Sequence, residues 1–201
     1  MAFDFPVLMV LIPAFPLAGA IVTAMFGKWL KHEAHWPVVV SIVCSAVLSL
    51  MLLSHVVHES ENSEMAVGWE TTIELWNWSG VPDALAAPER AIGLTETGVA
   101  IAPPARLPFS VDVTLRADAL TAIMLAVVTF VASLVAIYAV GYMHGDRGYW
   151  RFFSYIGLFV FSMTMLVSVS NFVLLYVFWE AVGLCRYLLV GFWYEKPAGI
   201  A

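Results

Sequence analysis

Five apolar stretches dominate the sequence, and each is long enough, or nearly so, to cross a lipid bilayer. A spanning helix needs about 20 apolar residues, because the hydrocarbon core of a bilayer is about 30 Å thick. Only 12% of the residues are charged and 62% are hydrophobic, which leaves too little polar surface for a soluble domain of this length. We therefore expect an all-α integral membrane protein of about five transmembrane helices. The expected spans are Phe5–Phe26, Trp36–Val57, Ala117–Val140, Phe152–Val169 and Asn171–Trp193.

The basic residues of the short loops predict the orientation of the chain. Lys28 and Lys31 follow the first span, and Arg147 and Arg151 precede the fourth. Cytoplasmic loops carry an excess of Lys and Arg, so we expect both loops in the cytoplasm and the N-terminus outside. No basic stripe is present, which argues against nucleic-acid binding. An aromatic belt is predicted at the cytoplasmic face, made of Trp36, Tyr149, Trp150, Trp193 and Tyr194.

A long acidic loop separates the second and third spans. Between His58 and Asp112 it holds nine acidic residues and two basic ones, Arg90 and Arg106. Two parts of it, TTIELWNW and LPFSVDVTLR, alternate polar and apolar residues and predict a small β-hairpin. The expected divisions are residues 1–57 with two transmembrane helices, the extracytoplasmic loop 58–114, and residues 115–201 with the other three helices.

The fifth span carries two charges that lipid disfavours. Glu180 lies nine residues after Asn171, about 14 Å into the helix and close to the bilayer midplane. A charge there costs about 2.5–3.5 kcal/mol on insertion scales, so such a group usually faces a wet cavity or a partner and indicates an ion or proton pathway. The alternative is a neutral acid bonded to a neighbouring helix. Arg186 is 120° around the helix from Glu180 and either reaches the cytoplasmic interface or pairs with another helix.

The remaining candidate residues carry weaker signals. His144, in the loop GYMHGDRG, could take up protons near neutral pH but is also a typical exposed turn residue. Asp112 and Arg116 have i,i+4 spacing and can pair if the third helix starts early enough; with Asp118 they predict a structural anchor at the outer interface. No nucleotide-binding loop or cysteine cluster is visible, so we expect no cofactor or metal in this chain. Cys44 and Cys185 fit small buried thiols, and the pair His55 and His58 lacks a visible third ligand.

The segment VFWEAVGLCRYLLVGFWYEKP resembles the fifth-helix signature of the antiporter-like subunit L, or chain 5, of proton-pumping NADH-quinone oxidoreductase. The resemblance extends over residues 108–197 and is one of pattern only over residues 1–57. It implies that Glu180 is a group through which protons pass. It also implies other membrane subunits as partners, with flavin, iron–sulfur clusters, NADH and quinone held elsewhere in the complex. The resemblance further implies that the chain lies in a cell inner (plasma) membrane or an equivalent energy-transducing membrane.

Two departures from the family pattern accompany this resemblance. Arg186 stands where the family usually has a small hydroxyl residue. The sequence also ends before the later helices of the family, including one whose buried lysine partners the glutamate. The alternatives are a related cation/proton antiporter or inorganic-carbon transporter subunit, and a truncated membrane protein that transports nothing.

Overall fold

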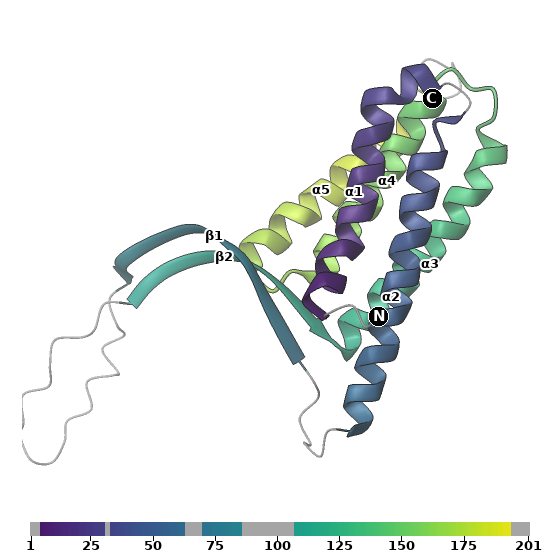
Figure 1. The fold of residues 1–201 in the computed structure, drawn as a ribbon. Coiled ribbons are helices and arrows are strands. Elements are labelled where there is room, and N and C mark those ends of the chain that lie inside the picture. The colour runs from purple at the N-terminus through teal and green to yellow at the C-terminus, as the bar shows by residue number, and fades with distance from the viewer. Residues whose placement is uncertain (1–4, 31–32, 63–69, 86–106, 194–201) are drawn as a thin grey trace, which may run out of the picture.

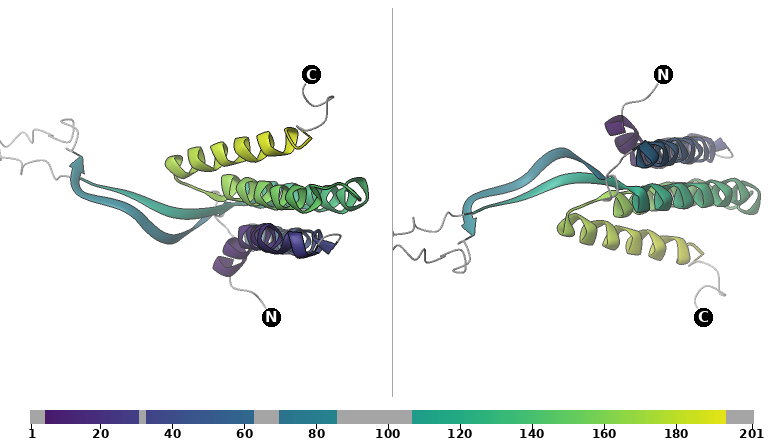
Figure 2. Two further views of the ribbon diagram at one scale, coloured as in Figure 1. Left: turned by 90° about the horizontal axis from the view of Figure 1, so that it is seen from above. Right: turned by 90° about the horizontal axis from the view of Figure 1, so that it is seen from below.

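The computed structural model describes residues 5–30, 33–62, 70–85 and 107–193. These ranges hold five helices long and apolar enough to cross a membrane, which confirms the predicted fold class. They are α1 (Phe5–Leu30), α2 (Trp36–Asn62), α3 (Ala119–Tyr142), α4 (Tyr149–Ser168) and α5 (Phe172–Val190). Seen from above or below, α1 and α2 form one layer, α3 and α4 a second, and α5 lies outside the second layer (Figure 2). The protein is therefore a helical membrane bundle with α5 at its edge.

The predicted hairpin is also present. Strand β1 (Glu70–Leu85) pairs antiparallel with β2 (Leu107–Asp118), and the ribbon projects away from the bundle beside the start of α5 (Figure 1). Its base is joined to the α4–α5 connection, where Leu115 forms a β-bridge with Val169 and the Ser170 amide donates to the Thr114 carbonyl. The apolar residues of β2 at this base, Val113, Leu115 and Ala117, enter a core shared with the ends of the helices.

Bulges in β1 keep the two faces of the hairpin distinct. Shifts of register occur between Glu74 and Trp76 and between Asn77 and Ser79. The first shift places Trp76 opposite Val113, on the face that continues into the core, while Asn77 pairs with Asp112 on the polar face. Because side chains alternate across a strand, an unbroken register would have reversed these two positions.

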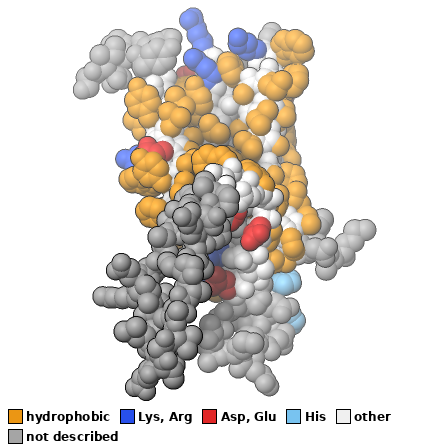
Figure 3. Space-filling view, turned by 90° about the vertical axis from the view of Figure 1, so that its left-hand side faces the viewer, with side chains coloured by type: hydrophobic (Ala, Val, Ile, Leu, Met, Phe, Trp, Pro, Cys, Tyr) orange, Lys and Arg blue, Asp and Glu red, His pale blue; other side chains and the backbone are white. Residues whose placement is uncertain are grey.

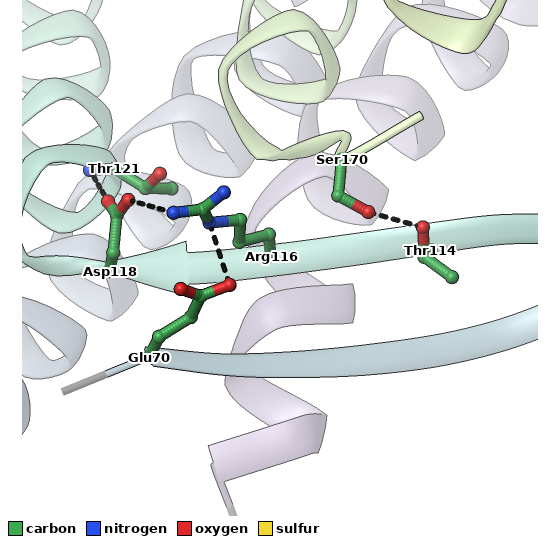
Figure 4. Close-up of polar contacts among 6 residues, drawn as sticks. All are labelled: Glu70, Thr114, Arg116, Asp118, Thr121 and Ser170. Carbon is green, nitrogen blue, oxygen red and sulfur yellow. Dashed lines mark hydrogen bonds and ion pairs between the residues drawn. The ribbon is translucent and has the colours of Figure 1, made fainter. Parts of the chain in front are cut away.

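The predicted anchor at the start of α3 needs one correction. Residues 112–118 are extended, in line with the strand predicted for LPFSVDVTLR, and α3 begins only at Ala119, so the helix does not start early enough for Asp112 to pair with Arg116. Four residues of a strand span about 13 Å, which is too far for an ion pair. Arg116 instead contacts Glu70 at 3.2 Å and Asp118 at 3.3 Å (Figure 4). Asp112 accepts hydrogen bonds from Asn77 and Ser110.

A proline explains how α1 and α2 pack. Pro16 lies inside α1 and has no N–H, so the carbonyl of Ile12, four residues earlier, receives no helical hydrogen bond from position 16. The Ser45 hydroxyl of α2 donates to that carbonyl at 2.7 Å, and both residues are fully buried. Since lipid cannot satisfy a backbone group, this bond completes the helix from outside it.

The opposite end of the bundle differs in part from the predicted aromatic belt. Trp36 is largely exposed, as an interfacial residue would be, but Tyr149 is buried and its hydroxyl lies 3.0 Å from Nδ1 of His35. This contact joins the α1–α2 connection to the first residue of α4. Trp150 packs against Gly27 of α1, where any larger residue would collide with the indole. Tyr194 lies outside the described residues.

Candidate functional site

Glu180 is the ninth of the 19 residues of α5 and so lies near the middle of a span about 28 Å long. Asn171 starts this helix, because its side chain accepts the Val173 amide at 2.8 Å. The structure places Glu180 on the exposed side of α5, where it forms no ion pair or hydrogen bond with any other described residue.

The rest of α5 explains this placement. The helix packs mainly against α4. Cys185 is buried, with its sulfur 3.9 Å from the Ser162 hydroxyl, and Phe178 stacks edge-on against Phe161 of α4 at 5.9 Å. These residues form the side of α5 that packs against α4.

The face that carries Glu180 is open. Tyr176, Val177, Leu184 and Tyr187 are all exposed, and a methyl group added to Gly183 would meet nothing within 4 Å. In the most apolar part of α5 only 11% of residues are buried, against 39–44% in the other four spans. Residues 5–30, 33–62, 70–85 and 107–193 therefore leave the carboxyl face of α5 uncovered.

Arg186 and His144 do not join Glu180 in one site. Arg186 is exposed and makes no ion pair with Glu180 or with another described residue. His144 lies in the turn after α3, in a shallow hollow with Tyr142, Asp146 and Trp193. Asp146 shapes this turn, since its carboxylate accepts the Gly148 amide at 2.9 Å and the Trp193 indole N–H at 3.0 Å. The adjacent Gly145 has a φ of 87°, a conformation that favours glycine.

At the hairpin end, Asp118 performs a structural role. Its carboxylate accepts the Thr121 amide at 2.6 Å and so caps the N-terminus of α3 (Figure 4). This hydrogen bond, aided by the nearby Arg116 guanidinium, holds the pKa of Asp118 below its usual range. Burial acts in the opposite sense but does not reverse the shift. Among the described residues, no group of three His, Cys, Asp or Glu side chains could hold a metal ion.

Comparison with known proteins connects this arrangement to one family. Residues 106–153 match the family described as NADH-ubiquinone oxidoreductase (complex I), chain 5 N-terminus. The chain is 36% identical over 193 residues to NADH-quinone oxidoreductase subunit L of Neisseria meningitidis, which covers 95% of this chain and 24% of that protein. It is 54% identical over 90 residues to subunit L of Rickettsia typhi, covering 45% of this chain and 14% of the relative. The chloroplastic NAD(P)H-quinone oxidoreductase subunit 5 of Chlorokybus atmophyticus is 53% identical over 90 residues, with the same coverage.

The chain thus spans about a quarter or less of the length of these relatives. The predicted resemblance is confirmed: the chain is a relative of subunit L, or chain 5, of the NADH-quinone oxidoreductases and matches the N-terminal portion of that family.

Proposed function

We propose that this chain forms the start of an antiporter-like membrane subunit in a proton-pumping NADH:quinone oxidoreductase. In this role Glu180 carries protons, while NADH, flavin, iron–sulfur clusters and quinone react in other subunits. The observation that carries the proposal is a carboxyl near the middle of a spanning helix, on a face that the described residues leave uncovered. A face exposed to lipid alone would strongly disfavour that group, so it is suited to meet further protein or water.

The side chains around Glu180 support a role in proton transfer. Gly183 lies on the same side, one turn further along, and permits close approach of another helix. Tyr176 and Tyr187 offer phenolic hydroxyls on this face, which could bind water or a neighbouring polar group. Arg186 is assigned an accessory role only, because it makes no contact with the carboxyl. His144 is proposed as an accessory site of proton uptake.

The proposed orientation places the N-terminus and the hairpin outside and the two basic connections in the cytoplasm. Its support is a group of Lys and Arg side chains at the end of the molecule opposite the hairpin (Figure 3), whereas Arg116 lies in the hairpin and is paired with Glu70. The hydrogen bond between His35 and Tyr149 shows that both connections share this end. Single cysteines at Glu74 and Arg147, labelled with an impermeant reagent in intact cells, test the proposal. Labelling is expected at position 74 alone, and labelling at position 147 alone would reverse the orientation.

The function is tested by replacing Glu180 in the assembled complex. Glu180→Gln keeps the size and hydrogen bonding of the side chain but cannot release a proton, so pumping in membrane vesicles should fall several-fold. Glu180→Asp should retain part of the activity. Glu74→Gln, at an exposed carboxyl of the hairpin, is the matched control and should pump normally.

NADH oxidation and assembly of the complex are measured in parallel with pumping. Undiminished pumping by an assembled Glu180→Gln complex would leave Glu180 as a structural hydrogen-bonding group and would refute the proposal. The proposal would also be refuted if Glu180→Gln reduced assembly of the complex but left pumping per assembled complex unchanged.

A further inference from the structure

A hollow of about 230 Å³ lies between the first turns of α4 and the end of α5. Arg151 and Tyr155, one helical turn apart, form the α4 side. Tyr187, Leu188, Gly191 and Phe192 form the α5 side. The hollow therefore brings one guanidinium and two phenols together beside apolar side chains. Of these residues, only Tyr187 also lies on the face of α5 that carries Glu180.

The charge of Arg151 is uncompensated within the described part of the chain, where the ion pairs are those of Arg116. Arg151 also stands in the first turn of α4, which holds no acidic residue. The N-terminal end of a helix carries partial positive charge, so a cation there is unfavourable unless an anion is nearby. The carboxylate of Asp146, in the loop that precedes α4, is bonded to Gly148 and Trp193. This end of α4 therefore favours a bound anion.

The position and walls of the hollow specify the kind of anion. It lies where α4 begins and α5 ends, so it opens at the boundary between hydrocarbon and headgroups. Phe192 is held in place by an edge-on contact with Phe152, with ring centroids 5.3 Å apart. A cationic group with apolar walls at this depth matches a lipid phosphate followed by its acyl chain, and basic pockets between transmembrane helices commonly bind anionic headgroups.

We propose that this hollow binds the phosphate of an anionic glycerophospholipid. Arg151 donates to the phosphate oxygens, the hydroxyls of Tyr155 and Tyr187 donate further hydrogen bonds, and the first acyl carbons lie along Leu188 and Phe192. A free phosphate shares the polar contacts but would gain nothing from the apolar wall. The proposal is independent of whether Glu180 carries protons.

The test measures lipid binding to the purified chain in nondenaturing detergent by native mass spectrometry, with phosphatidylglycerol and phosphatidylcholine of identical acyl chains. Phosphatidylglycerol should bind preferentially. Arg151→Gln should weaken its binding about tenfold, the range expected for a hydrogen bond to a charged group. The matched control Arg147→Gln removes the same charge from the exposed loop four residues earlier and should change binding less than twofold. Tyr155→Phe, which removes only a hydroxyl, should weaken binding by a smaller factor.

Several results would overturn the proposal. Equal binding of the two lipids would show that the hollow does not recognise the headgroup charge. Equal weakening by Arg147→Gln would show general attraction to the basic surface. Displacement of phosphatidylglycerol by millimolar inorganic phosphate would identify a free-phosphate site. If Arg151→Gln does not fold, as judged by circular dichroism, Arg151→Lys and Tyr155→Phe take its place, and unchanged binding in both would refute the assignment.

Discussion

The hydrogen bond from Ser45 to the carbonyl of Ile12 gives a prediction that separates local from tertiary effects. Ser45→Ala removes the donor and leaves a fully buried carbonyl unsatisfied, because Pro16 cannot supply a backbone N–H. An unsatisfied buried acceptor costs about 1–3 kcal/mol. Interhelical hydrogen bonds in membrane proteins average about 0.6 kcal/mol with a maximum near 1.7. We therefore expect Ser45→Ala to lower the free energy of unfolding by about 1–2 kcal/mol.

The same reasoning predicts a rescue. In a Pro16→Ala background, the new backbone N–H at position 16 can bond to the Ile12 carbonyl within α1, as in an uninterrupted helix. Ser45→Ala should then cost less than about 0.5 kcal/mol, within the range of an ordinary substitution away from such features. The coupling energy between the two sites should thus be about 1 kcal/mol or more.

The assay is reversible unfolding of the four variants in mixed micelles with increasing SDS, followed by circular dichroism. Ser41→Ala is the matched control, because the Ser41 hydroxyl donates within its own helix to Val38, at 2.8 Å. That substitution should change the free energy of unfolding by about 0.5 kcal/mol or less. The reasoning fails if Ser45→Ala costs the same with and without Pro16, or if Ser41→Ala is equally damaging.

Three further predictions concern other parts of the bundle. Gly19→Ala should destabilise the protein by about 1–3 kcal/mol, because the added methyl group would collide with the Ser41 hydroxyl and lie 2.9 Å from the Pro37 carbonyl oxygen. Gly183→Ala, at an open position, should be neutral or stabilising by up to about 1 kcal/mol. Unfolding in SDS tests the pair, and equal effects of the two substitutions would contradict the prediction. Asp118→Ala should lower the free energy of unfolding by about 1 kcal/mol in the same assay, because it removes the cap of α3. Since the pKa of Asp118 is lower in the folded state, the stabilisation due to the ionised carboxylate should be complete above pH 5 and decline as the pH falls through about 4 and below. A cost of the substitution that persists unchanged at pH 2 would be inconsistent with this. Glu70→Gln should cost less than about 1 kcal/mol in 0.15 M salt, because both partners of its ion pair with Arg116 are more than 40% exposed, and a larger loss on unfolding would refute the surface assignment.

The sequence alone determined the membrane class, the five spans and the hairpin. A stretch of about 20 apolar residues is stable chiefly as a transmembrane helix, and strict alternation of polar and apolar residues favours a strand. It also marked Glu180, because a carboxyl inside such a stretch is expensive wherever the helix packs. It left the partner of Arg116 open: the i,i+4 spacing of Asp112 and Arg116 would suit a helix, but LPFSVDVTLR also alternates as a strand does, and pairing with β1 holds these residues extended as far as Asp118.

Only the tertiary structure decided which groups meet across the bundle. Pro16 in a helix leaves the carbonyl of Ile12 without its helical hydrogen bond. The donor that satisfies this carbonyl, Ser45, lies 33 residues away in the sequence, and only the crossing of α1 over α2 brings the two together. The sequence predicted Tyr149 as an interfacial aromatic residue, but the fold buries it, with its hydroxyl against His35. Arg151 and Tyr187 come from separate helices, and their shared hollow exists only because α5 packs along α4. The local sequence pattern predicts which side of each segment is exposed to solvent or lipid. Contacts between distant segments depend instead on helix crossing angles and side-chain volumes, which cannot be predicted from any single segment.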